Sequence, residues 1–189
     1  MASILSVEQL QGLAAGSTPN TITIPSGQKL HAPGHIVQLI SVEASGNYSF
    51  NTATGTYTDI TGLTLNITPK FNNSKIFLTA KIDISGASNQ RWGTRFTRDG
   101  SVPAGSIGDA DGSRTRSHSS GRGEAGNQID CNVGMQFLDS PATTNQVTYK
   151  VQITMEGNNQ VVVNRSITHS DSATVYVSLS TLTAMEVAQ

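Results

Sequence analysis

Strict alternation of apolar and polar residues in two stretches constrains the fold of this chain more than any other feature. In the first stretch, residues 75–85, the apolar face consists of Ile76, Leu78, Ala80, Ile82 and Ile84. In the second stretch, residues 147–156, it consists of Val147, Tyr149, Val151, Ile153 and Met155. A period of two residues over this length is typical of a β-strand with one face in a core and the other nearer to solvent.

Weaker patterns of the same kind predict six further strands, at residues 36–43, 57–67, 91–98, 132–138, 160–167 and 173–187. Turn-rich segments separate these strands, and no two of them are joined by a helical pattern, which argues against a parallel sheet. Gly62 interrupts one strand, so we expect a β-bulge there. The alternation slips before Leu182 in the last strand, which suggests a bulge or a bend. The sequence therefore predicts an all-β fold, an antiparallel β-sandwich that resembles a jelly roll, with about eight strands.

Composition excludes several classes of function. Charged residues make up 13% of the chain and the net charge is −1, so we expect neither nucleic acid nor an anionic membrane as a partner. No stretch reaches the roughly 18 apolar residues of a membrane span, and the N-terminus lacks the features of a secretory signal, so we expect assembly in a host cytoplasm. The single cysteine, Cys131, cannot form an internal disulfide and is expected as a small buried residue.

The N-terminal part differs from the rest and is predicted as an attachment segment and connector, residues 1–35, before a β-sandwich at 36–189. Residues Ser6–Ala14 form the only plausible helix, which is too short to be stable alone. Turns are predicted at Pro25 and at Pro33–Gly34. The apolar residues expected to contact another protein chain are Val7, Leu10, Leu13, Ile22 and Ile24.

A long polar segment, residues 99–130, has an unusual charge pattern. Six of the seven arginines lie between Arg91 and Arg122, and this window holds three more positive than negative charges. We expect Arg98 to pair with the aspartates of this segment, and Arg114 and Arg116 to contact a neighbouring subunit. The spacing of Asp109 and Asp111 resembles the start of an EF-hand calcium loop. The later ligand positions of such a loop do not fit, so neither aspartate is assigned to a metal.

No enzyme signature is present in the chain. It contains no nucleophile elbow, phosphate loop or dinucleotide fingerprint, and Pro33–Gly34 forbids a helix that would place His31 and His35 on one face. We therefore expect no catalytic residue, no cofactor and no metal. Trp92 is expected in the core or at an interface, because stacking on a sugar would need an exposed ring.

Four motifs, FTRDG, GDADGSRTR, LDSPATT and NRS, occur in this order. Over residues 57–187 the chain resembles virion structural proteins of tailed bacteriophages, especially marine ones, often labelled tail fibre or virion structural proteins. The resemblance implies a β-sandwich knob, a homotrimer displayed on the particle surface. The short N-terminal segment favours a capsid decoration, cement or short head-fibre protein that binds other virion proteins. The alternative is a tail-fibre knob that binds a receptor or a host-surface glycan.

Overall fold

The computed structural model of the protein describes residues 24–26, 28–87, 89–123, 129–157 and 160–189. The chain divides into two compact units, residues 1–31 and residues 32–189, and the predicted boundary after residue 35 stays a prediction. The helix predicted at Ser6–Ala14, with Val7, Leu10 and Leu13, lies outside the described residues, as does Ile22. In the described part of the first unit, the amide of Gln28 donates to the carbonyl of Pro25 at 3.0 Å, which confirms that turn.

The described residues of the second unit form ten strands, which confirms the predicted all-β class. They are β1 (Ile36–Ala44), β2 (Tyr48–Asn51), β3 (Thr58–Ile67), β4 (Lys75–Gly86), β5 (Arg91–Arg98), β6 (Ser119–Arg122), β7 (Ile129–Asp139), β8 (Val147–Met155), β9 (Gln160–Val163) and β10 (Ser180–Val187). Every pairing between them is antiparallel.

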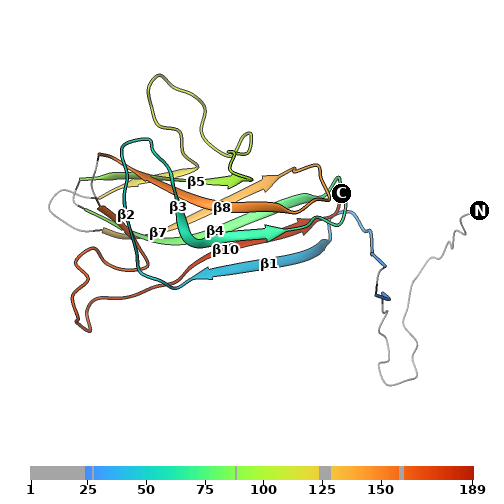
Figure 1. Ribbon diagram of the computed structural model, residues 1–189, viewed down its shortest axis with the longest axis horizontal. Coiled ribbons are helices and arrows are strands. Elements are labelled where there is room, and N and C mark those ends of the chain that lie inside the picture. Colours follow the sequence, from blue (N-terminus) through green and yellow to red (C-terminus); the bar gives the residue numbers. More distant parts are fainter. Residues whose placement is uncertain (1–23, 27, 88, 124–128, 158–159) are drawn as a thin grey trace, which may run out of the picture. The chain divides into compact units, whose positions relative to one another are not determined.

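The strands build two sheets that pack face to face (Figure 1). In sheet A, the central strand β4 pairs with β7 along one edge. Along its other edge it pairs first with β10 and then, further along, with β9. Strand β1 pairs with the free edge of β10, and β2 pairs with the free edge of β9. Sheet B has the order β3-β8-β5-β6. Strands far apart in sequence are neighbours, as in the two interlocked Greek keys of a jelly roll. The predicted jelly-roll-like sandwich is therefore confirmed.

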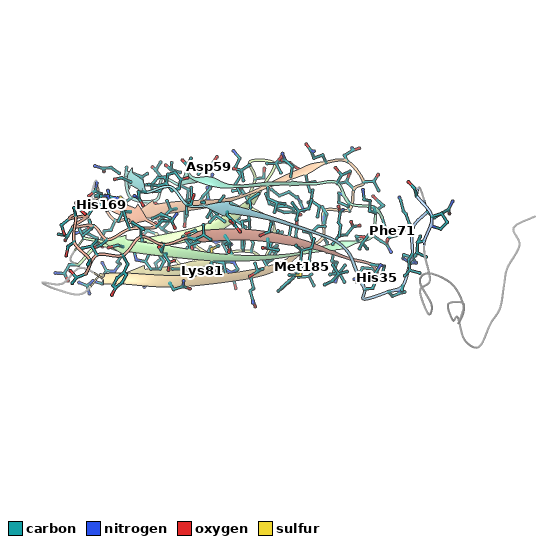
Figure 2. All side chains as sticks on the ribbon, turned by 90° about the horizontal axis from the view of Figure 1, so that it is seen from below. His35, Asp59, Phe71, Lys81, His169 and Met185 are labelled. Carbon is teal, nitrogen blue, oxygen red and sulfur yellow. The ribbon has the colours of Figure 1, made fainter. Side chains whose placement is uncertain are left out.

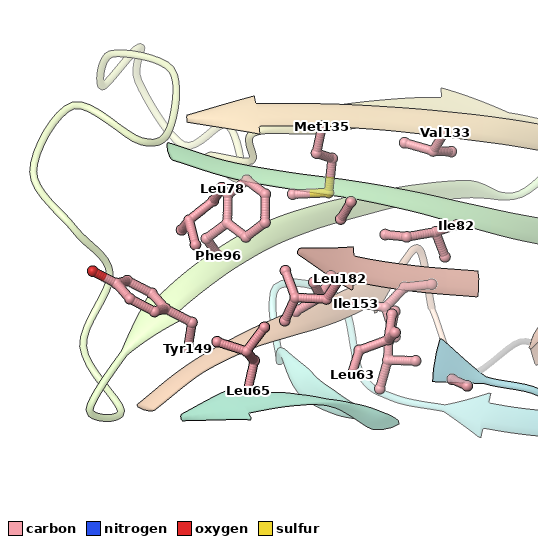
Figure 3. Packing of buried hydrophobic residues seen from close by; sticks show 14 of the residues in the cluster. Leu63, Leu65, Leu78, Ile82, Phe96, Val133, Met135, Tyr149, Ile153 and Leu182 are labelled. Atoms are coloured by element: carbon pink, nitrogen blue, oxygen red, sulfur yellow. The ribbon is translucent and has the colours of Figure 1, made fainter. Parts of the chain in front are cut away.

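The core lies between the two sheets and is built from the inward positions of the alternating strands. Figure 3 shows Leu78 and Ile82 of β4 facing Leu65 of β3 and Ile153 of β8, and all four are at most 1% exposed. Trp92 joins this cluster at 8% exposure, which confirms a core position for the indole. Burial of such apolar surface is the main force that holds the sheets together.

The predicted bulge at Gly62 is also confirmed. The register between β3 and β8 shifts between Asp59 and Thr64, and Gly62 has a φ of 86°. A Cβ at this position would lie 2.9 Å from the Cβ of Ala44, so both the backbone conformation and the space favour glycine.

Two predicted strands have wrong bounds, and two short strands were not predicted. The last strand begins at Ser180, not at residue 173, because the alternating residues before it do not enter the core: Tyr176 is 78% exposed and Val177 is 67% exposed. Strand β9 ends at Val163 because Asn164 turns the chain with a φ of 66°. The short strands β2 and β6 were missed.

A partly buried ion pair ties the two sheets together at one end. Arg98 of β5 donates through Nη1 to both carboxylate oxygens of Asp139 of β7, at 2.9 and 2.7 Å, and the hydroxyl of Tyr149 of β8 donates to Asp139 at 2.6 Å. Burial and the hydrogen bond to Asp139 raise the pKa of Tyr149 well above its usual range. The predicted partners of Arg98 were therefore wrong: it binds Asp139 because that carboxylate points inward between the sheets, whereas Asp109 and Asp111 lie on an exposed loop.

Candidate functional site

An apolar row crosses the outer face of sheet A. The register places Leu39 of β1 beside Met185 of β10, Met185 beside Phe77 of β4, and Phe77 beside Leu138 of β7. Leu39 is 55% exposed and Leu138 is 48% exposed. The row thus spans the full width of the sheet at this end. We refer to these four residues as the apolar row.

The same face becomes polar toward its other end. Next to the apolar row, the hydroxyls of Ser41 and Thr183 are 2.8 Å apart, and further along Lys81 donates to Asp83 at 2.7 Å. Figure 2 views sheet A from below, with Met185 and Lys81 labelled on the two parts of the face. Burial alone would raise the pKa of Asp83, but hydrogen bonds from Lys81 and Asn132 and the charge of Lys81 outweigh it and hold that pKa below its ordinary value.

The outer face of sheet B is covered in part by the 99–118 loop, which connects β5 to β6 and rises from the sandwich in yellow-green in Figure 1. One contact within the loop and two contacts with the rest of the sandwich hold it in place. His118 Nδ1 donates to the carbonyl of Ser106 at 2.8 Å, and the His118 ring meets Phe96 edge to face, with centroids 5.2 Å apart. Tyr57 donates to the carbonyl of Arg116 at 2.7 Å. The loop is therefore fixed to the sandwich by one ring contact and by one hydrogen bond to its backbone.

The predicted loop residues lie within this ordered segment. Arg114 pairs with Asp111 at 3.0 Å, with about three quarters of each side chain exposed. Arg116 donates through Nε to the carbonyl of Gly108 at 2.6 Å, and Asp109 is exposed. One Arg–Asp pair of the predicted kind is thus present, although an exposed pair contributes little to stability. Contact of Arg114 and Arg116 with another subunit stays a prediction, as does a contact of Ile24, which is 43% exposed.

Two polar clusters line the strands beside the loop. Lys150 and Gln152 of β8 each donate to Asp59 of β3 at 2.7 Å; burial alone would raise the pKa of Asp59, but these hydrogen bonds and the charge of Lys150 lower it. The guanidinium carbon of Arg95 lies 3.8 Å from the centroid of the Tyr57 ring. Burial raises the pKa of the Tyr57 phenol despite the opposing charge of Arg95.

The described residues contain neither a cluster of metal ligands nor a membrane-spanning helix. No group of three or more His, Cys, Asp or Glu side chains gathers there as a metal site would require. No helix in this part of the chain is long and apolar enough to cross a membrane. Cys131, expected as fully buried, is only half-buried and packs against the edge of the core, since it lies near the start of the edge strand β7.

Comparisons with known proteins yielded structural similarity only. No protein-family model matches the sequence, and no curated protein is significantly similar to it. The chain is similar to a structure of infectious bursal disease virus, Gx strain, with 13% identity over 93% of this chain and a TM-score of 0.43. It is also similar to the VP2 subviral particle of that virus, with 12% identity over 80% of this chain and a TM-score of 0.39. The chain spans 42% and 37% of the lengths of these two proteins.

Proposed function

We propose that this protein is a non-enzymatic structural protein of a tailed-bacteriophage particle. In this proposal it forms a homotrimer on the capsid surface, as a decoration, cement or short head-fibre protein, and its N-terminal segment attaches it to other virion proteins. The four motifs FTRDG, GDADGSRTR, LDSPATT and NRS, which occur in this order, support the resemblance to phage virion proteins. A jelly-roll sandwich is also an architecture common in viral capsids. The observation that supports trimer formation is the apolar row on sheet A.

The apolar row is of the kind that association buries. Scattered apolar residues on a surface need no explanation, whereas a continuous patch rimmed by polar residues marks an interaction site. Here four neighbouring strands each contribute one large apolar side chain at the same height of the sheet. A second copy of the chain that packs on this face would remove Leu39 and Leu138 from water, while the Ser41–Thr183 hydroxyl pair would lie at the polar rim.

Assembly is tested by the mass of the protein in solution. The double variant Leu39→Glu with Leu138→Glu places two charges in the apolar row and is expected to convert a trimer into a monomer in sedimentation equilibrium. The matched control is Ser41→Glu with Gln136→Glu, which adds the same charges to the same two strands one row away. A monomeric parent protein, or equal masses for both double variants, would contradict an interface on the apolar row.

Attachment is tested separately, on particles. Deletion of residues 1–30 should abolish incorporation into the particle, while the circular dichroism of the β-sandwich stays that of the parent. Density for the protein on the head of the particle supports the capsid role; density on the tail would instead support the tail-fibre alternative. Undiminished incorporation of the deletion variant would contradict attachment through the N-terminal segment.

A further inference from the structure

We propose that a hollow on the outer face of sheet B binds a neutral saccharide. The hollow has a volume of about 310 Å³ and lies between the strands of sheet B, the 99–118 loop and the turn that precedes β3. This volume is at the lower end of the range for small-molecule sites. The proposal goes beyond the structural role above, because it concerns the isolated chain and holds whether or not the chain assembles.

The floor of the hollow is a row of three residues with no large side chain. The register places Thr154 of β8 beside Gly93 of β5, and Gly93 beside Ser120 of β6. A Cβ on Gly93 would lie 3.1 Å from the Cβ of Ser117 and 3.3 Å from the hydroxyl of Tyr57. Glycine at position 93 therefore lets the side chains of Ser117 and Tyr57 pack directly on the floor. Thr154 and Ser120 place a hydroxyl-bearing residue on each side of it.

The hydroxyl of Thr154 indicates that something polar belongs in this space. Thr154 is 5% exposed, and its Oγ1 has no hydrogen-bond partner within the described part of the chain. Most buried polar atoms in proteins are paired, and an unpaired one costs stability. Because Thr154 lines the hollow, a hydroxyl of a bound molecule would supply the missing partner.

The walls of the hollow combine an aromatic ring with a fixed ion pair. Tyr57 lines one side; Arg95 covers one face of its ring at 3.8 Å and is not itself part of the lining. On the rim, Arg91 donates through Nη1 to both carboxylate oxygens of Glu156, at 3.0 Å each. More than two fifths of each of these two charged side chains is exposed.

This set of groups fits a sugar better than a charged ligand. A sugar hydroxyl both donates and accepts, so it can accept from Arg91 and donate to Glu156 or Thr154, and the C–H face of the sugar ring can pack on an aromatic side chain. Of the three charged residues in the lining, Arg91 is paired with Glu156 and Arg114 is paired with Asp111, so neither a phosphate nor a cation would meet an unpaired opposite charge. The sequence could not reveal this site, because Tyr57, Gly93 and Thr154 are far apart along the chain.

The single tryptophan of the chain provides a direct test. Trp92 lies in the lining of the hollow, so binding there should change its emission. The full-length protein would be titrated with glucose, galactose, mannose and N-acetylglucosamine, with saturation-transfer NMR as a second measurement. We expect at least one of these sugars to give a saturable response by both methods.

Two variants and one matched control assign the response to the hollow. Thr154→Val removes the buried hydroxyl and should weaken binding about two- to tenfold. Gly93→Ala should abolish binding, because its Cβ would displace Ser117 and Tyr57, which line the hollow. The control, Thr97→Val, removes another buried and unpartnered hydroxyl, from a position on β5 that does not line the hollow, and should leave affinity unchanged. Inorganic phosphate should not compete.

Three results would overturn the proposal. These are the absence of a response to every sugar in the panel, equal affinities for the parent, Thr154→Val and Gly93→Ala, and competition by phosphate. None of them bears on assembly, since the trimer is tested by mass with changes on sheet A. Failure of the saccharide site and failure of the proposed structural role are therefore distinguishable.

Discussion

The outer faces of the two sheets differ in what they present to other molecules. Sheet A carries the apolar row, which is continuous across four strands, whereas sheet B carries hydroxyls, ion pairs and a hollow beneath the 99–118 loop. A continuous apolar face suits another protein surface, while a concave polar face suits a small molecule. One sandwich can therefore serve assembly on one side and recognition on the other.

The largest expected effect comes from removing the Arg98–Asp139 ion pair that ties the two sheets together. Asp139→Ala leaves Arg98 and the Tyr149 hydroxyl without their buried partner, so we expect the free energy of unfolding to fall by about 3 kcal/mol. Urea denaturation measures this change. Asp111→Ala, which breaks the exposed pair with Arg114, should cost no more than about 0.5 kcal/mol. Equal losses in the two variants would show that the tie does not hold the faces in place.

The next largest effect concerns the edge where β3 approaches β1. Gly62→Ala should cost about 1–3 kcal/mol, because alanine tolerates the φ of 86° poorly and its Cβ would meet Ala44. Gly34→Ala is the matched control, since Gly34 has the same φ but nothing within 4 Å of a new Cβ. The difference between the two losses, measured by thermal unfolding, gives the contribution of the close approach. If Gly34→Ala lost as much stability as Gly62→Ala, the backbone conformation alone would account for both losses, and the contact with Ala44 would contribute nothing.

A smaller effect compares one carboxylate on each face. The pKa values of Asp59 on sheet B and Asp83 on sheet A are both lowered in the folded state, below 3.8. The folded protein thus binds these protons less tightly than the unfolded chain does. Their stabilisation is present above about pH 5 and is lost as the pH falls through the folded pKa values. Carboxylate NMR titrations should give midpoints below 3.8 for both, and a midpoint above 3.8 at either would contradict its hydrogen-bonded environment.

For the last pair of variants we expect no change in sugar affinity or in mass, and this result tests whether the two faces act independently. Leu39→Glu with Leu138→Glu should leave the sugar titration unchanged, and Gly93→Ala should leave the mass in solution unchanged, because residues on opposite faces share no partners. A change in sugar affinity on dissociation would mean that a neighbouring subunit completes the hollow. In that case the two faces would not have separate roles.

The long strands could be predicted from the sequence, and the short ones could not. Strands β4 and β8 alternate over most of their length because each has one buried face. Strand β6, Ser119–Arg122, has no apolar residue; it is held by its pairing with β5, where the Trp92 ring lies over Gly121. Strand β6 therefore depends on its pairing with β5, and no pattern within its own residues predicts it.

The last strand shows the opposite error. Residues 173–179 alternate as a strand would, yet Tyr176 and Val177 are largely exposed, since this segment lies outside the sandwich. The polar segment 99–130 was predicted as one long connection, but it contains strand β6, and only residues 99–118 form the loop. The anchors of this loop, His118 and Tyr57, were not predicted, because their partners are set by tertiary structure. Alternation predicts which face is apolar; it does not predict what that face will meet.

The tandem arrangement of β9 and β10 has a practical consequence for protein engineering. The chain leaves sheet A at Asn164 and returns at Ser180 on the same side of β4, and the Ser180 hydroxyl donates to Asn164 at 2.6 Å across this gap. The excursion between them can be lengthened without moving either strand, since loop closure costs grow slowly with length. A peptide inserted at the exposed Ser170–Asp171 bond would be displayed by a sheet whose register is unchanged.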